Sequence, residues 1–485
     1  MSEFSDLFKD YVHKKNVKVA AMAQTLSVDR ANLYKVISGK RNPSSRKVVS
    51  EIADYLALTP AEKQEFLELY HMAEIGRERY YQRKSALHFI SSCFSNQDSL
   101  FDIKPKSYSE TIIPVDFPEV STAICGKEQL QQTLSLLCRQ AVLSGSARIR
   151  IIAQPTWEYL FSLLKALSYL NANLNIEHII CLNIGDSPAG FKRSVYNMYC
   201  LEKMLPLFRC QCQYTPYFYY DNVDSHFTNM HTFPYYVITD DGALTCSSDI
   251  QRGIIYYQPD IVNLLQSTFT KQLASANTLF HMIGNNVKKY MEITLSSLGC
   301  TLEGSPCLLK YASPAMLAQI LKIPECSNDD SLILQEIIGY TQQIDHYQGN
   351  SQGYSLTFSD VGMKNFLETG RIESYPDYLY NPLPMDMRLQ LLRILLEQPD
   401  KNMPRRLKAP LSDLASYSGI TINKTSGYLI IKQFDGQLMY LALQEQSLLN
   451  GLYDFIHNLE QDNLLYSYEE TRDFIEDILA KYSAS

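Results

Sequence analysis

With 485 residues, of which 46% are hydrophobic and 20% charged, the chain is too long for a single core and too apolar to be intrinsically disordered. Its net charge of −8 excludes a uniformly basic protein. No apolar run reaches about 18 residues, the length needed to span a membrane. The N-terminus has the pattern of an amphipathic helix rather than a secretion signal, and the eleven cysteines are scattered. We therefore expect about three folded domains in a cytoplasmic protein without membrane contact.

Residues 17–44 contain two short amphipathic helices separated by a tight polar turn. Apolar residues at helical spacing give each helix one inward face, within Val19–Leu26 and within Leu33–Ile37. Asp29 is placed to cap the second helix, and Gly39 is placed to end it. Two such helices bury their facing stripes only if they cross steeply, so the outer face of the second remains free for the major groove of DNA.

This segment resembles the Cro/Xre family of helix-turn-helix domains, over roughly residues 4–70. The most specific stretch is A-x-x-L-x-V at 23–28 followed by L-x-x-V-I-x-G-K-R-x-P-S at 33–44. The resemblance implies two sets of DNA-contacting residues. Those expected at base edges are Asp29, Arg30, Ala31 and Lys35, and those expected near phosphates or the groove rim are Asn32, Tyr34, Lys40 and Arg41. Ser27 departs from the family, which usually has glycine in the turn.

Charge is distributed unevenly along the chain. Residues 1–50 hold ten Lys or Arg and four Asp or Glu, a net charge of +6, so the other 435 residues carry −14. A localised basic patch on an acidic body is what phosphate contact requires, because counterions are released only where the protein touches DNA. We therefore expect double-stranded DNA as a partner of the N-terminal domain. The alternative is an ordinary helical hairpin with a solvated basic face.

We expect the DNA-binding domain to span residues 1–72, followed by a helical connector and linker at 73–118. A helical pattern continues from Ala61 to about Phe94, and it opens with the capping-box sequence Thr59-Pro60-Ala61-Glu62. Residues 95–118 lack periodicity, as is typical of a linker.

Residues 119–284 have the pattern of an α/β domain. The predicted strands and helix lie at 148–152, 176–182, 233–239, 242–246 and 259–275. The stretch Tyr235–Asp240 followed by Cys246–Ile250 resembles, more weakly, the second signature half of phospholipase-D-like domains. Those enzymes carry His-x-Lys-x4-Asp, but here Phe233 and Tyr235 occupy the His and Lys positions. The resemblance implies a catalytically inactive sensor domain, and we expect no enzyme activity and no cofactor.

Two further residue clusters of this region are candidate binding sites. Cys210, Cys212, His226 and His231 offer four metal ligands, but one residue between the cysteines fits a zinc knuckle poorly, so we expect no metal. Four tyrosines in an aromatic run are candidates for lining an effector pocket, although sheet packing also explains these residues and is the stronger explanation. They are Tyr214, Tyr217, Tyr219 and Tyr220.

Residues 285–485 are expected to form a second α/β domain, either another half of the sensor or a dimerisation module. Helices are predicted at 315–323, 331–347, 361–368 and 385–397, strands at 425–433 and 437–444 around Asp435-Gly436, and two helices at the end.

The predicted fold class is multidomain, with an all-α helix-turn-helix domain followed by a mixed α/β body. The predicted function is a sequence-specific transcriptional regulator that binds DNA as a homodimer, because one such helix covers only a few base pairs, and whose body binds a small-molecule or peptide effector. The alternatives are an interaction protein associated with defence or toxin control that uses the helix-turn-helix for self-regulation, and a phosphodiesterase or nuclease guided by it.

Overall fold

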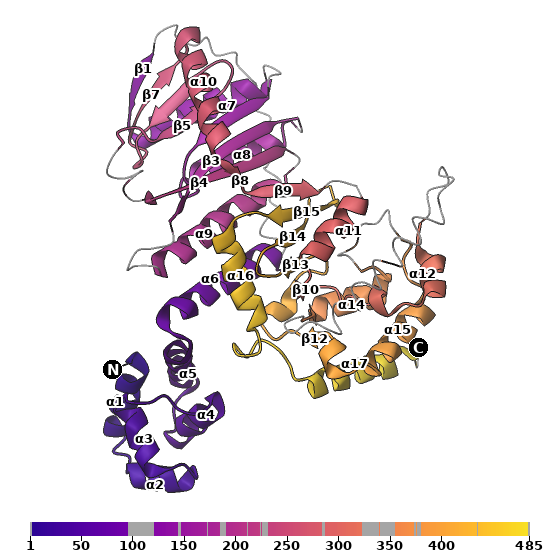
Figure 1. The fold of residues 1–485 in the computed structure, drawn as a ribbon. Coiled ribbons are helices and arrows are strands. Elements are labelled where there is room, and N and C mark those ends of the chain that lie inside the picture. Colours follow the sequence, from indigo (N-terminus) through magenta and orange to yellow (C-terminus); the bar gives the residue numbers. More distant parts are fainter. Residues whose placement is uncertain are drawn as a thin grey trace. The chain divides into compact units, whose positions relative to one another are not determined.

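The computed structural model divides the chain into two compact units. The N-terminal unit comprises Met1–Ser85 with Ala189–Val195, and the second unit, here called the body, comprises Ala86–Pro188 and Tyr196–Ser485. The described residues are 2–95, 121–143, 147–171, 173–184, 191–210, 212–223, 225, 231–283, 287–322, 339, 355–372, 375, 380–433 and 435–483. A helical N-terminal unit followed by an α/β body confirms the predicted fold class (Figure 1).

The N-terminal unit consists of short capped helices around an aromatic core. They are α1 (Glu3–Lys14), α2 (Val19–Thr25), α3 (Arg30–Ile37), α4 (Arg46–Tyr55), α5 (Pro60–Ile75) and the start of α6 (Arg77–Phe94). In the core, the Phe66 ring of α5 lies 4.8 Å from Phe4 and 5.5 Å from Phe8 of α1, centroid to centroid. The capping box that the sequence predicts at Thr59 and Glu62 is present at the start of α5. Aromatic packing of α5 on α1 thus supports the three helices between them.

The helical pattern after Thr59 is broken once. Gly76 adopts a φ of +90°, a conformation that glycine reaches without a steric penalty, so α5 ends at Ile75 and α6 begins at Arg77. The predicted linker at 95–118 lies outside the described residues except for Ser95.

The first half of the body is built on an eight-stranded sheet with the order β1-β7-β6-β5-β2-β3-β4-β8. Its strands are β1 (Thr122–Cys125), β2 (Arg148–Ile152), β3 (Asn175–Asn183), β4 (Gln213–Asp221), β5 (Tyr235–Ile238), β6 (Ala243–Cys246), β7 (Arg252–Tyr256) and β8 (Asn277–Thr278). Strands β2, β3 and β4 pair in parallel, whereas the other neighbours are antiparallel. The predicted strands of this region are therefore confirmed.

Helices cover both faces of this sheet. They are α7 (Lys127–Leu143), α8 (Glu158–Ser168), α9 (Phe191–Phe208) and α10 (Pro259–Ser275). Leu134 of α7 and Leu164 of α8 belong to the large core on one face, whereas Phe269 of α10 packs with Ile152 and Ile179 on the other. The sheet is consequently buried between helices, which agrees with the continuous apolar character of its central strands.

The buried imidazole of His178 on β3 is neutral. Its Nε2–H donates to the carbonyl of Ala153 at 2.9 Å, and Nδ1 lies 2.8 Å from the Tyr214 hydroxyl, which can donate to the neutral ring. Burial lowers the pKa of His178 from 6.5 to about 4.

This histidine predicts acid lability of the body. Because the unfolded chain binds a proton near pH 6.5 and the folded chain does not until about pH 4, the stabilisation is present above pH 6.5 and is lost as the pH falls towards 4. We expect the free energy of unfolding to drop by about 2 kcal/mol between pH 7 and pH 5. Urea unfolding followed by fluorescence of Trp157, the single tryptophan, measures this directly. The drop should shrink in His178→Gln but persist in a variant of the exposed His281, His281→Gln; equal drops in both variants would contradict the assignment.

The second half of the body contains a five-stranded antiparallel sheet with the order β10-β13-β14-β15-β9. These strands are β9 (Phe280–Ile283), β10 (Cys300–Glu303), β13 (Gly419–Ile422), β14 (Gly427–Lys432) and β15 (Leu438–Leu443). The predicted hairpin at Asp435-Gly436 joins β14 to β15, and Gly436 has a φ of +88°. Strand β9 follows β8 directly in sequence but pairs with β15, so the chain changes sheets at Leu279.

Helices and a short parallel strand pair complete this half. They are α11 (Val287–Ser296), α12 (Pro314–Ile320), α14 (Asp360–Thr369), α15 (Met385–Leu396), α16 (Gln446–His457), α17 (Tyr468–Ser483), β11 (Thr357–Phe358), β12 (Arg405–Arg406) and the 3-10 turns Leu309–Tyr311, Asp400–Asn402 and Leu411–Asp413. The helix predicted at 331–347 lies outside the described residues apart from Gly339. Within the described ranges, no helix combines the length and apolar character that crossing a membrane requires.

Candidate nucleic-acid interface

Helices α2 and α3 lie where the sequence predicts the two helices of a helix-turn-helix. Met22 of α2 and Leu33 and Val36 of α3 are buried in the core of the N-terminal unit. Asp29 caps α3 by accepting the backbone N–H of Asn32 on Oδ1 at 2.8 Å. Gly39 has a φ of +71°, and its N–H donates to the Val36 carbonyl, which ends the helix. The inner face and the end of α3 are therefore fixed by the fold, and its outer face is free.

The turn between the two helices contains Ser27, the residue at which the sequence departs from the Cro/Xre pattern that it resembles. Ser27 adopts a φ of +52°, in the left-handed region that favours glycine. We expect Ser27→Gly to stabilise the N-terminal unit by about 0.5–1 kcal/mol, because glycine carries no side chain that strains this conformation. Hydrogen exchange of the α2 and α3 amides measures the change. Ser38→Gly, at a residue with a φ of −81°, is the matched control and should destabilise.

All eight residues predicted to contact DNA are exposed, and several are held in place by their neighbours. The guanidinium of Arg30 lies 5.6 Å from the ring centroid of Tyr34, one turn later on α3. Nη1 of Arg41 donates to Oδ1 of Asn32 at 3.2 Å. The backbone N–H of Lys40 donates to the Lys35 carbonyl at 2.8 Å. The loop after α3 thus folds back onto the helix and brings its cations to the helix rim. Ala31 and the carboxylate of Asp29 sit at the helix start.

The positive charge of this surface is not neutralised internally. Residues 18–47 include seven Lys or Arg and one acid, Asp29. Of the ion pairs formed among the described residues, none involves these seven cations. The acids of α5 instead pair or hydrogen-bond locally, as Glu62 does with Thr59. A surface whose cations have no internal counterions attracts phosphate and gains from counterion release.

Three residues that the sequence reasoning did not single out also belong to this surface. Lys18 and Lys47 are exposed at the N-terminal ends of α2 and α4, where unpaired backbone N–H groups also favour anions. Asn42 secures the loop that carries Arg41, because its Nδ2 donates to the carbonyl of Ala73 on α5 at 2.9 Å. The charge count over residues 1–50 contained the signal for the two lysines, but the long-range bond of Asn42 has no local sequence pattern.

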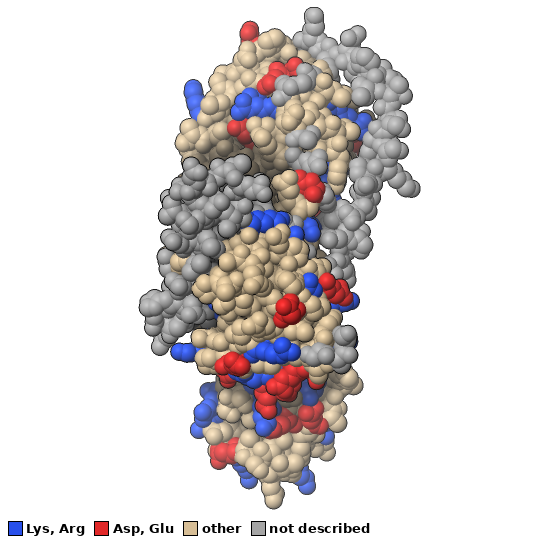
Figure 2. Space-filling model, turned by 90° about the vertical axis from the view of Figure 1, so that its right-hand side faces the viewer, with Lys and Arg blue, Asp and Glu red and all other residues tan. Residues whose placement is uncertain are grey.

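The charge on one face of the molecule is mixed. On the face shown in Figure 2, Lys and Arg atoms lie in small groups near Asp and Glu atoms, separated by broad uncharged areas. Among the described residues of this face there is accordingly no broad basic surface, in keeping with the acidic balance of residues 51–485.

The four tyrosines predicted to line a pocket do not converge on one site. They lie on β4, where successive side chains point to opposite faces of the sheet. Tyr214 is buried against His178, and the Tyr220 hydroxyl donates to Glu445 of the body. Tyr217 and Tyr219 pack on the opposite face with the α10 cluster. Effector binding by these residues stays a prediction, and sheet packing accounts for their positions.

The residues in the phospholipase-D-like signature are held in packing and ionic contacts. The Tyr235 ring stacks on Trp157 at 5.7 Å, and Asp240 pairs with Nη1 of Arg150 at 3.0 Å. Over the described part of the chain, no group of three His, Cys, Asp or Glu is placed to hold a metal ion, and His226 lies outside that part.

Comparisons with known proteins do not assign the chain to a family. No family model and no curated protein matches it. One similar solved structure is that of TrmBL2, described as an archaeal chromatin protein with a novel mode of DNA binding, with a TM-score of 0.19 and 10% identity over 57% of this chain and 95% of that one. Another is phosphatidylserine synthase from Haemophilus influenzae, with a TM-score of 0.23 and 9% identity over 83% and 97%. At these TM-scores neither likeness carries a conclusion about fold or function.

Proposed function

We propose that the chain is a sequence-specific DNA-binding transcriptional regulator in which α3 enters the major groove. The observation that carries the proposal is the outer face of α3 and its following loop, where Arg30, Lys35, Lys40 and Arg41 are exposed and form no ion pair within the described part of the chain. The inner face of the same helix is locked by Leu33 and Val36. A rigid helix with a free cationic face can place side chains at base edges while the loop binds phosphates.

The regulator is proposed to act as a homodimer in the cytoplasm, and its body is proposed to bind an effector. One recognition helix covers only a few base pairs, so two N-terminal units on a two-fold site give the length that specific binding needs. The body is several times larger than DNA binding requires. A ligand of the body can change DNA affinity only if it binds two states of the protein with different affinities.

The test is binding of the purified full chain to DNA from upstream of its own gene, compared with scrambled DNA across a salt series. If about five of the exposed cations contact phosphates, the logarithm of the binding constant should fall with the logarithm of salt concentration with a slope of about −4 to −5. Specific retention with such a slope is the expected result. Equal and weak binding to both DNAs would contradict the proposal.

One observation favours a second candidate, a non-enzymatic interaction protein that uses the helix-turn-helix for self-regulation. Three large apolar side chains at the C-terminal ends of α7 and α8 are exposed by 40–55%, and Nδ2 of Asn171 donates to the Val142 carbonyl, so the two helix ends lie together. They are Leu143, Tyr169 and Leu170. Exposed apolar side chains gathered around one junction are typical of a protein-binding face. Co-purification of a protein encoded beside this gene, lost in Leu143→Ser/Leu170→Ser, would support this candidate.

A further inference from the structure

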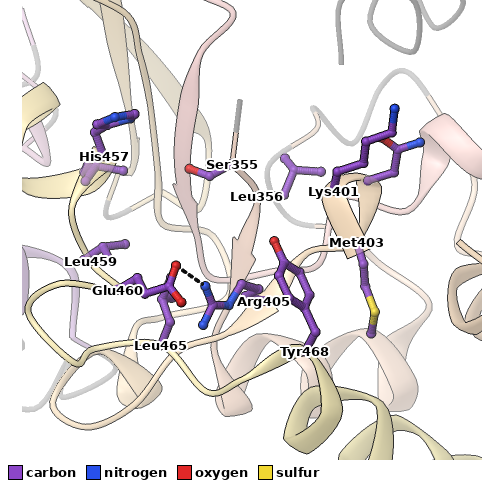
Figure 3. Close-up of a pocket in the computed structure, with 12 residues that line it drawn as sticks. Ser355, Leu356, Lys401, Met403, Arg405, His457, Leu459, Glu460, Leu465 and Tyr468 are labelled. Carbon is purple, nitrogen blue, oxygen red and sulfur yellow. Dashed lines mark ion pairs between the residues drawn. The ribbon is translucent and has the colours of Figure 1, made fainter. Parts of the chain in front are cut away.

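The body contains a small cavity whose walls come from segments far apart in sequence. It has a volume of about 120 Å³ and lies among β12, the turn Asp400–Asn402, the end of α16 and the start of α17. The segment between α16 and α17 wraps around β12 through hydrogen bonds such as that from the Lys408 N–H to the Leu464 carbonyl. Figure 3 shows side chains from all of these segments facing the same space.

The main charged group of the cavity is the guanidinium of Arg405, a residue that is 8% exposed. Its Nε and Nη2 donate to the Tyr466 carbonyl at 2.9 and 2.8 Å, and the ring of Tyr468 lies 4.8 Å from its central carbon. These contacts fix the plane of the guanidinium but leave its charge uncompensated. A buried cation needs an anion nearby, since removal from water is otherwise very unfavourable.

The anion that Arg405 holds is a surface carboxylate. Oε2 of Glu460 lies 2.9 Å from Nη1 of Arg405, yet the Glu460 side chain is 77% exposed. Figure 3 shows this ion pair at the edge of the cavity, beside the ring of Tyr468. Releasing an exposed carboxylate into water costs little free energy, because an ion pair with one exposed partner is weak. A carboxylate supplied by a ligand can therefore replace Glu460 on a guanidinium that is already oriented.

The remaining polar walls add a second recognition element. Lys401 lines the same cavity and is exposed. Its ammonium group adds a second positive charge beside Arg405, which favours an anionic ligand.

We propose that this cavity binds a small carboxylic acid, whose carboxylate displaces Glu460 from Arg405. The volume is below the roughly 300–1,000 Å³ of sites for drug-sized ligands, which restricts the ligand to a few heavy atoms. Such a ligand would be the effector of the proposed regulator, and to that extent the inference rests on the proposed function.

The experiment is calorimetric titration of the full chain with L-malate, succinate and inorganic phosphate at constant ionic strength. L-malate and succinate should both bind, and phosphate should bind more weakly than either of them. Removal of the competing carboxylate in Glu460→Gln should tighten L-malate binding by about three- to ten-fold. The matched control is Glu469→Gln, a change at an exposed acid of α17 that does not line the cavity and should leave binding unchanged.

The outcomes separate this inference from the function proposed above, because the titration contains no DNA. Absence of heat with L-malate in both the natural chain and Glu460→Gln would overturn the site, as would weaker binding in Glu460→Gln. Tighter binding of phosphate than of L-malate would overturn the assignment to carboxylic acids. Arg405→Lys should weaken L-malate binding at least ten-fold, since lysine cannot reproduce the planar guanidinium. If Arg405→Lys does not fold, the Glu460→Gln result decides the question.

Discussion

Replacing Arg30 and Lys35 together with alanine is expected to weaken binding to the specific DNA site by about 30-fold or more, while binding to scrambled DNA changes much less. Both side chains are exposed on the outer face of α3, one turn and a half apart. A well-placed contact to a base edge contributes about 1–3 kcal/mol of discrimination, so the loss of two gives an effect of this size. Electrophoretic mobility shifts or fluorescence anisotropy on both DNAs give the two affinities.

Two matched variants show whether the effect depends on position rather than on charge. Lys9→Ala removes an exposed cation of α1, outside the proposed contact surface, and should leave the specific affinity nearly unchanged. Lys40→Ala should weaken binding to both DNAs by the same factor. It should also reduce the slope of the salt dependence by about one. If the double variant kept its full preference for the specific site, α3 would not be the recognition helix.

Phe66→Ala is expected to unfold the N-terminal unit, or to lower its free energy of unfolding by about 3–5 kcal/mol. Phe66 is fully buried, and its ring contacts Phe4, Phe8 and Tyr11 of α1. The cavity left by the ring cannot collapse easily, because each neighbour is an aromatic side chain packed on others. A unit of this size has only a marginal stability, so the change should abolish DNA binding as well.

Hydrogen exchange of the full-length chain resolves this effect by region. Amides of residues 2–75 should lose protection, whereas urea unfolding followed by Trp157 fluorescence, which reports on the body, should not change. Glu65→Ala, at an exposed neighbour on the same helix, should leave protection of the unit intact. Retained protection in Phe66→Ala would show that the aromatic core does not support α2 and α3.

The sequence allowed the local elements to be predicted because their signals are local. The stripe of Met22, Leu33 and Val36, the cap at Asp29 and the glycine after α3 each lie within one turn of the structure they specify. The same holds for β2, β3 and the hairpin at Asp435-Gly436. Exposed positions on α3 followed directly once its buried face was known.

Features made by distant residues were not predictable in this way. Strand β9 lies beside β15, more than 150 residues later, and nothing in the four residues of β9 indicates that pairing. The cavity around Arg405 likewise depends on Glu460, Tyr466 and Tyr468, which wrap back onto β12. The aromatic run of β4 shows that neighbours in sequence need not form one site in space. Adjacent tyrosines look like one cluster in sequence, but a strand sends them to two faces.

The crossing of the chain from one sheet to the other at Leu279 limits how this molecule can be divided. A cut before β8 would separate β8 from its partner β4, and a cut after β9 would leave β15 with an open edge. Residues of both sheets also share one hydrophobic core, and Asn197 of α9 donates to Ser447 of α16 at 3.0 Å. Chimeras that exchange only half of the body should therefore aggregate, whereas chimeras that exchange the whole body should remain soluble. Recombination between related genes can therefore exchange this body only by replacing both sheets at once.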